Sequence, residues 1–339
     1  MIYTDLADKF VGSLIGGAAG DALGYPVEFM DESRIFEKYG DEGITDYELD
    51  SGYALISDDT QMTLFTAEGL LSARGKARKL LPCIWNSYLD WLKTQRSDEP
   101  ASFMGLLTEE RLYYRRAPGN TCLSALKRGR AGRLDRPIND SKGCGGVMRV
   151  APIALYCFSA RIDILDADRL GAEAAALTHG HELGYIPAAH LVHIIYRILG
   201  GYGLREAVID AIGSVGELFG TLQHYEYASE LLRRALALAE SDADRSECIR
   251  SLGEGWVAEE ALAIAVYAAV KYSSDIHAAL VAAVNHSGDS DSTGAITGNI
   301  LGALLGMSAI PKRLTRRLEL SSTVRELALE LYSVPPSAR

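Results

Sequence analysis

The chain has 339 residues, of which 48% are hydrophobic and 23% charged, proportions typical of a globular protein with a large core. Its 45 acidic residues outnumber the 34 Lys and Arg, and the formal net charge of −11 argues against a nucleic-acid-binding surface. Five scattered cysteines without a C-x-x-C pair indicate neither a disulfide framework nor a zinc site. They favour a reducing, cytoplasmic location, and the first residues lack a signal-peptide pattern.

Apolar residues recur at three- and four-residue spacing along most of the chain, which predicts an all-α fold. Helices are expected over 61–73, 168–178, 187–199, 226–239, 257–271, 276–284 and 322–332. Loops are expected over 31–56, 94–105, 115–149 and 241–255, and a frayed tail over 334–339. Because no stretch resembles an interdomain linker, residues 1–339 are expected to form a single domain, a compact multi-helix bundle. The uncharged run from Ser292 to Pro311 is only weakly apolar, which favours a buried core helix over a membrane span.

Glycine recurs at every fourth residue in two expected helices. The two sets are Gly12, Gly16, Gly20 and Gly24, and Gly294, Gly298, Gly302 and Gly306. Glycine costs an exposed helix interior about 0.5–1 kcal/mol relative to alanine, so a stripe of it predicts that neighbouring backbones approach closely. The two helices are therefore expected to pack centrally, which would bring Asp21 and Asp291 into one neighbourhood.

Two polar turns, far apart in the sequence, each open an apolar helix. Their carboxylates and hydroxyls are Ser57, Asp58 and Asp59 in one turn, and Asp289, Asp291 and Ser292 in the other. Such residues are ordinary helix caps, but capping needs only one residue per helix. Several converging oxygen ligands suit Mg²⁺, Mn²⁺ or Ca²⁺, and the twelve-residue EF-hand spacing is missing. The two turns are interpreted as halves of one metal site.

The glycine-rich segment 16–24 fails the context test for a dinucleotide-binding loop, because no strand precedes it. A helix is expected to end near Gly24, followed by a turn that delivers Glu28 towards the metal site. Asp21 is interpreted either as a cap partner or as an acceptor behind the metal ligands.

A second glycine-rich block suits a phosphate-binding loop or a plain flexible loop. Its members are Lys142, Gly143, Cys144, Gly145, Gly146, Val147 and Met148. A nucleophilic Cys144 with His179 as its base is a weaker alternative, because cysteine is commonly a small buried residue. His190 and His193 are interpreted as packing residues. Trp256 is either a core residue or an adenine-stacking platform.

Seven blocks together resemble the ADP-ribosylglycohydrolase family, which includes ADP-ribosyl-arginine hydrolases and dinitrogenase-reductase-activating glycohydrolases. They are G-D-A-L-G-x-P-x-E (20–28), S-D-D-T-Q (57–61), R-A-P-G-N-T (116–121), K-G-C-G-G-V-M-R-x-A-P (142–152), T-H-x-H (178–181), G-W-V-A-E-E-A (255–261) and G-D-S-D-S-T-G (288–294). The resemblance runs from about residue 9 to about residue 308.

The resemblance implies an all-α orthogonal multi-helix bundle whose central cleft holds two Mg²⁺ ions, Mn²⁺ being possible. It also implies that the protein hydrolyses the bond between ADP-ribose and a modified side chain. The implied metal ligands are Ser57, Asp58, Asp59, Asp289, Asp291 and Ser292. Asp58, Asp291 or Glu28 would transfer the proton, residues 142–148 would hold the diphosphate and distal ribose, and His179 and Trp256 would contact ADP-ribose. Arginine-linked mono-ADP-ribose on a protein is the expected substrate, and ADP-ribose the product. Serine-linked or O-acetyl-ADP-ribose, a silent ADP-ribose-binding or structural protein, and a phosphohydrolase acting on the diphosphate are the alternatives.

Overall fold

A computed structural model describes residues 4–97, 99–100 and 104–336. Its helices are α1 (Asp5–Gly24), α2 (Glu32–Tyr39), α3 (Asp58–Ser72), α4 (Leu80–Thr94), α5 (Asn120–Lys127), α6 (Ala151–Ser159), α7 (Ile164–Ala176), α8 (Glu182–Leu199), α9 (Leu204–Phe219), α10 (Tyr225–Ala239), α11 (Arg245–Leu252), α12 (Ala258–Lys271), α13 (Ile276–Val284), α14 (Ser290–Leu305), α15 (Lys312–Arg316) and α16 (Ser321–Tyr332). Within the described residues the only β-structure consists of isolated bridges, so the prediction of a compact all-α fold is confirmed.

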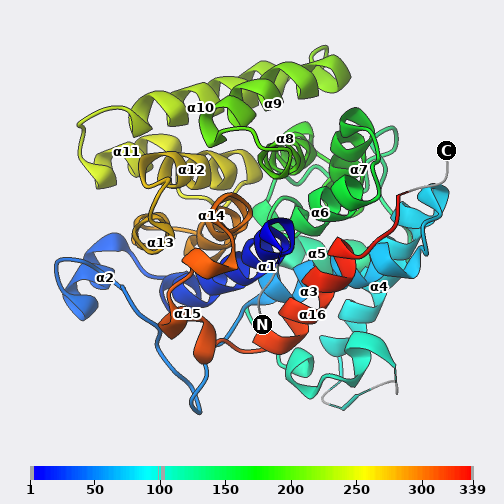
Figure 1. Ribbon diagram of the computed structural model, residues 1–339, viewed down its shortest axis with the longest axis horizontal. Helices are drawn as coiled ribbons and strands as arrows, with labels where there is room; N and C mark the ends of the chain where they lie inside the picture. Colours follow the sequence, from blue (N-terminus) through cyan, green and yellow to red (C-terminus); the bar gives the residue numbers. More distant parts are fainter. Residues whose placement is uncertain (1–3, 98, 101–103, 337–339) are drawn as a thin grey trace.

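Helices α1 and α14 lie side by side at the centre of the molecule (Figure 1). A Cβ built on Gly294 would lie 2.5 Å from the carbonyl oxygen of Gly20, and one built on Gly298 would collide with the backbone of Gly16. The two glycine stripes therefore face each other along an antiparallel contact, as the four-residue spacing predicted. Only glycine permits this approach, because any side chain would have to occupy the partner's backbone.

The other helices surround this central pair. Helices α9, α10 and α11 form one edge of the molecule, α2 and α13 lie on a second side, and α3, α4 and α16 on a third (Figure 1). The apolar faces of α7, α8 and α12 pack inward between them. No helix in the described part of the chain is long and apolar enough to cross a membrane.

The seven helical ranges predicted from periodicity all correspond to helices, and α1 ends at Gly24 as expected. Three of the predicted loops are wrong in part, because 31–56 contains α2, 115–149 contains α5 and 241–255 contains α11. These helices have eight residues each, too few for a repeating apolar pattern to stand out. Helix α6 escaped prediction because it is buried on all sides and so shows no apolar stripe. Of the expected frayed tail, 337–339 lie outside the described residues.

Candidate active site

The N-termini of α3 and α14 meet at one cleft of about 430 Å³. Ser57 caps α3 by accepting a hydrogen bond from the Asp59 backbone nitrogen at 3.1 Å. Asp289 caps α14 by accepting from the Ser292 backbone nitrogen at 3.2 Å. Asp58, Asp59, Asp289, Asp291 and Ser292 line the cleft, so the structure brings the two predicted turns together. The positive ends of both helix dipoles favour negative groups at this place.

Glu28 enters the same cleft from the turn that follows α1. Pro26 lies in a short 3-10 helix, Tyr25–Val27, which carries the chain from the end of α1 across the start of α14. Glu28 is nearly buried, and its Oε2 atom has no hydrogen-bond partner. The sequence-based expectation that this turn delivers Glu28 therefore agrees with its position in the structure.

Burial, and after it the repulsion between neighbouring carboxylates, disfavours ionisation of the clustered carboxyl groups. Burial, followed by the charges of Asp289 and Asp58, raises the pKa of Glu28 to about 9. Burial and the charges of Asp21 and Asp289 raise the pKa of Asp58 to about 8. For Asp59 and Asp291, burial is again the main cause, and neighbouring carboxylates add to it, so that both pKa values lie well above the usual range.

This arrangement fits divalent cations, which would offset the repulsion between the carboxylates and be coordinated by oxygen atoms without a hydrogen-bond partner, such as Asp59 Oδ1. Within the described residues, however, no three His, Cys, Asp or Glu side chains are placed so that they could hold a metal ion as they stand. The ligand assignment is therefore a proposal, and Ser57, which is fully buried as the cap of α3, does not line the cleft.

Asp21 holds the α3 turn from behind. Its carboxylate accepts hydrogen bonds from the backbone nitrogens of Ser57 at 2.9 Å and Thr60 at 3.0 Å, and from the Thr60 hydroxyl. Burial raises the pKa of Asp21 to about 6. Asp21 thus serves as the cap partner that the sequence suggested, reaching across from the central helix.

The predicted glycine loop forms part of the wall of the same cleft. Gly143, Cys144, Gly145 and Met148 line the cleft, whereas Gly146 and Val147 are buried behind it. The Cys144 thiol donates a hydrogen bond to Asp289 Oδ2 at 2.7 Å, and its backbone nitrogen donates to the Trp256 carbonyl at 3.2 Å. Burial and the nearby carboxylates raise the pKa of this thiol well above its ordinary value, which disfavours a thiolate nucleophile.

Lys142, predicted as a phosphate contact, instead points towards α12. Its Nζ atom lies 2.6 Å from Oε1 of the buried Glu259, and the side chain is not part of the cleft lining. The ion pair anchors the start of the glycine loop, since the Lys142 carbonyl also accepts from the Ala258 backbone nitrogen at 2.9 Å.

A model of the ADP-ribosylglycohydrolase family matches residues 3–339 of this chain. The chain belongs to the ADP-ribosylglycohydrolase family. It is 25% identical over 319 residues to the ADP-ribosyl-(dinitrogen reductase) glycohydrolase of Rhodospirillum rubrum, covering 92% of this chain and 91% of that relative. It is also 25% identical to the ADP-ribosylarginine hydrolase Tri1 of Pseudomonas putida, over 97% of this chain and 79% of the relative. A solved structure called an ADP-ribosylglycohydrolase-related protein complex has a TM-score of 0.68 and 26% identity, covering 97% of this chain and 99% of its own.

Membership of the ADP-ribosylglycohydrolase family supports hydrolase activity that releases ADP-ribose from modified groups, and the family is metal-dependent. The cleft at α3 and α14 is where the family's blocks converge. Blocks at opposite ends of the chain contribute side chains to this single cleft, Glu28 from G-D-A-L-G-x-P-x-E and Asp289, Asp291 and Ser292 from G-D-S-D-S-T-G.

Two parts of the cleft were not predicted as site residues. The first is the segment Ala117–Thr121, where Gly119 donates a backbone hydrogen bond to Asp58 Oδ2 at 3.1 Å. The R-A-P-G-N-T block, one of the seven that carry the resemblance, could have identified this segment as part of the site. The second is Phe29, 72% exposed, whose ring stacks on Trp256 with 5.9 Å between centroids. Trp256 is 39% exposed and lines the cleft, so its interpretation as a core residue is wrong.

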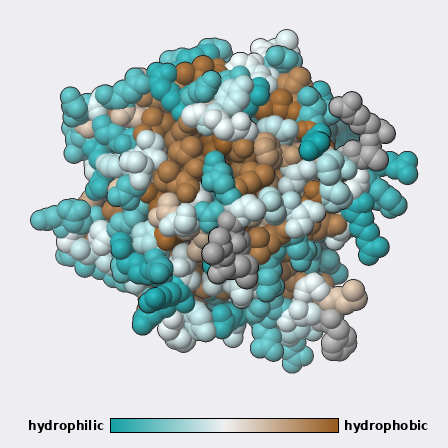
Figure 2. Space-filling model, in the orientation of Figure 1, coloured by the Kyte–Doolittle hydropathy of each residue, from teal (hydrophilic) through white to brown (hydrophobic). Residues whose placement is uncertain are grey.

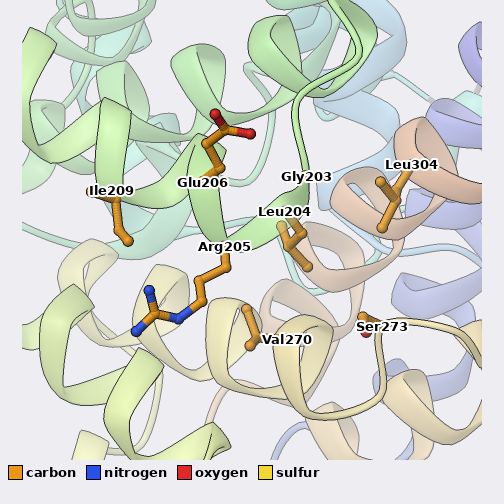
Figure 3. Close-up of a pocket in the computed structure, with 8 residues that line it drawn as sticks. All are labelled: Gly203, Leu204, Arg205, Glu206, Ile209, Val270, Ser273 and Leu304. Atoms are coloured by element: carbon orange, nitrogen blue, oxygen red, sulfur yellow. The ribbon is translucent and has the colours of Figure 1, made fainter.

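Another hollow, of about 620 Å³, lies where the start of α9 meets the ends of α12 and α14 (Figure 3). Leu204, Val270 and Leu304 border it, and Figure 2 shows an apolar patch on this face of the molecule. Arg205 and Glu206 are its charged lining residues. This larger hollow lacks the clustered carboxylates that line the cleft at α3 and α14. The smaller cleft, at α3 and α14, is therefore the candidate active site of this glycohydrolase.

Proposed function

We propose that the protein hydrolyses the N-glycosidic bond between ADP-ribose and an arginine side chain of a modified protein, with two Mg²⁺ ions or, in their place, Mn²⁺. The observation that carries the proposal is the buried carboxylate cluster at the joined N-termini of α3 and α14, lying next to a glycine-lined wall. Arginine is proposed as the linkage because a relative that matches 97% of this chain is an ADP-ribosylarginine hydrolase.

The proposed metal ligands are Ser57, Asp58, Asp59, Asp289, Asp291 and Ser292. Their oxygen atoms are the hard donors that Mg²⁺ and Mn²⁺ prefer. When bound, such ions neutralise the clustered charge, orient the ribose hydroxyls and lower the pKa of an attacking water.

The remaining chemistry falls to the protein's own side chains. Cleavage at the anomeric carbon develops oxocarbenium character and needs a proton for the leaving nitrogen and a base for the water. Asp58, Asp291 and Glu28 are the proposed proton carriers, since all three line the cleft. Glu28 has a free Oε2 atom, which leaves it able to hold a proton at the cleft.

The diphosphate and distal ribose are proposed to lie along Gly143, Cys144, Gly145 and Met148. Backbone at glycine can approach phosphate oxygens closely because no Cβ intervenes. The stacked rings of Phe29 and Trp256 border the same space and offer an aromatic surface to the ligand.

The test is incubation of the purified protein with arginine-, serine- and O-acetyl-linked ADP-ribose, with Mg²⁺ or with a chelator, and identification of products by mass. Mg²⁺-dependent release of intact ADP-ribose from the arginine conjugate is the expected result. Release of AMP and ribose 5-phosphate would instead indicate hydrolysis of the diphosphate. Absence of release from every substrate would contradict the proposed activity.

A further inference from the structure

Arg149 is a fully buried cation, and its hydrogen-bond partners in the described structure are sulfur atoms, a carbonyl and a hydroxyl instead of a carboxylate. Its guanidinium stacks on the Tyr88 ring with 4.2 Å to the centroid. One terminal nitrogen donates to the Ala174 carbonyl at 3.2 Å and to the Thr178 hydroxyl at 2.6 Å. Burial of an unpaired charge is costly, so a guanidinium in this position beside the cleft wall indicates a role other than stabilising the fold.

Hydrogen-bond direction can be followed from Arg149 to His179. A guanidinium only donates, so the Thr178 oxygen must accept. The same hydroxyl lies 2.9 Å from His179 Nδ1, and its own hydrogen is free to be donated there. Nδ1 is then the unprotonated acceptor, and a neutral imidazole carries its hydrogen on Nε2. The opposite tautomer would leave the buried Thr178 hydroxyl hydrogen without an acceptor.

The Nε2 edge of His179 faces the cleft. A Cβ built on Gly143 would lie 3.5 Å from Nε2, one built on Gly145 would lie 3.3 Å from it, and all three residues line the cleft. Asn139 fixes the backbone on either side, donating to the Thr178 carbonyl at 2.8 Å and accepting from the Gly180 nitrogen at 2.9 Å. Burial, and then the charge of Arg149, lower the pKa of His179 to about 3, so the ring is neutral at physiological pH.

We propose that Arg149 and Thr178 are positioning residues that hold His179 as a neutral donor, with Nε2–H directed at an oxygen of ADP-ribose in the cleft. The ligand's identity rests on the proposed function, whereas the tautomer does not. Protonation at Nε2 removes the lone pair that a metal ligand or a general base facing the cleft would need. His179 is thereby assigned to binding, and the alternative pairing of Cys144 with His179 as a base is excluded.

The hydrogen bonds from Arg149 to Thr178 and from Thr178 to His179 form a relay that sets the tautomer of His179. This relay can be tested without substrate by long-range ¹H–¹⁵N spectra of the protein labelled at its seven histidines. The expected pattern for His179, identified by its loss in His179→Gln, is a proton on Nε2 and none on Nδ1. Thr178→Ser, which keeps the hydroxyl, should retain that pattern, and Thr178→Val, which lacks it, should lose it. A proton on Nδ1 in the wild type, or an unchanged pattern in Thr178→Val, would overturn the relay.

ADP-ribose binding, measured by calorimetry, supplies the functional arm. Thr178→Val should weaken binding about 5- to 30-fold, the range of one to two hydrogen bonds' free energy, and Thr178→Ser should stay within about threefold of the wild type. Thr94→Val is the matched control: it removes another buried hydroxyl, which donates to the Trp91 carbonyl on α4, and should leave binding unchanged. Equal binding by Thr178→Val and the wild type would overturn the donor role. The Nε2–H pattern without any ADP-ribose binding by the wild type would overturn the proposed function and the donor's target while leaving the relay intact.

Discussion

Asp21 on α1 accepts a hydrogen bond from the backbone nitrogen of Thr60 on α3 at 3.0 Å, although the two residues are 39 positions apart. The same carboxylate also accepts from the Ser57 backbone nitrogen. The central helix thus caps the helix that carries half of the proposed metal ligands. Fold and site are coupled at this contact, because loosening the cap would displace Asp58 and Asp59.

We expect Asp21→Ala to lower the free energy of unfolding by about 2–4 kcal/mol, because it leaves buried N–H groups without acceptors. Urea denaturation would measure the loss. The control is Asp163→Ala, which removes an exposed cap of α7 that accepts from the Leu165 nitrogen at 2.9 Å and should cost only about 1 kcal/mol. Similar losses in the two variants would contradict the cross-helix cap.

The contact between the two glycine stripes predicts that substituting alanine for a glycine inside the contact and for a helical glycine outside it will change stability in opposite directions. Gly294→Ala should destabilise the protein by at least about 2 kcal/mol, because its Cβ would meet the Gly20 carbonyl oxygen. Gly213→Ala on α9 has nothing within 4 Å of the added Cβ and should be stabilising by about 0.5–1 kcal/mol. Thermal and urea unfolding would compare them, and a harmless Gly294→Ala would show that α1 and α14 do not pack this closely.

The proposed metal site predicts that divalent cations stabilise the fold. Mg²⁺ or Mn²⁺ should raise the melting temperature of the wild type, and a chelator should reverse the rise, because a ligand that binds only the folded state stabilises it. Asp291→Ala should abolish hydrolysis and sharply reduce this metal-dependent rise. Asp242→Ala, an exposed position on the α10–α11 connection, is the control and should behave as the wild type. Full activity of Asp291→Ala would contradict its assignment as a ligand.

His190 predicts a loss of stability in acid. Burial, with a smaller effect of His193, lowers the pKa of His190 to about 3, against an ordinary value of about 6.5. Below pH 6.5 His190 takes up a proton in the unfolded chain but stays neutral in the folded protein, so the free energy of unfolding falls as the pH falls towards 3. Between pH 6.5 and 4.5 the wild type should lose about 2–3 kcal/mol more than His190→Leu. Urea denaturation across this range would measure the difference, and parallel pH profiles would show that His190 does not contribute.

The sequence by itself determined the all-α class, seven helical ranges and the pairing of the two glycine stripes, because helical periodicity and the absence of a Cβ act through local geometry. That pairing also explains why Asp21 and Asp291 could be expected in one neighbourhood. The sequence likewise indicated two polar turns whose oxygens suit one cation site, since residue type alone limits ligand chemistry.

Only the tertiary structure decided where the side chains of those segments point. It directs Lys142 to Glu259 instead of the cleft, stacks the exposed Phe29 on Trp256, and joins Arg149 to His179 through Thr178. Each of these contacts links residues from segments separated in sequence, and each depends on helix orientation and side-chain direction, which no local pattern encodes. The clustered carboxyl groups owe their raised pKa values to the same cause, because burial and mutual repulsion arise only once α1, α3 and α14 have come together.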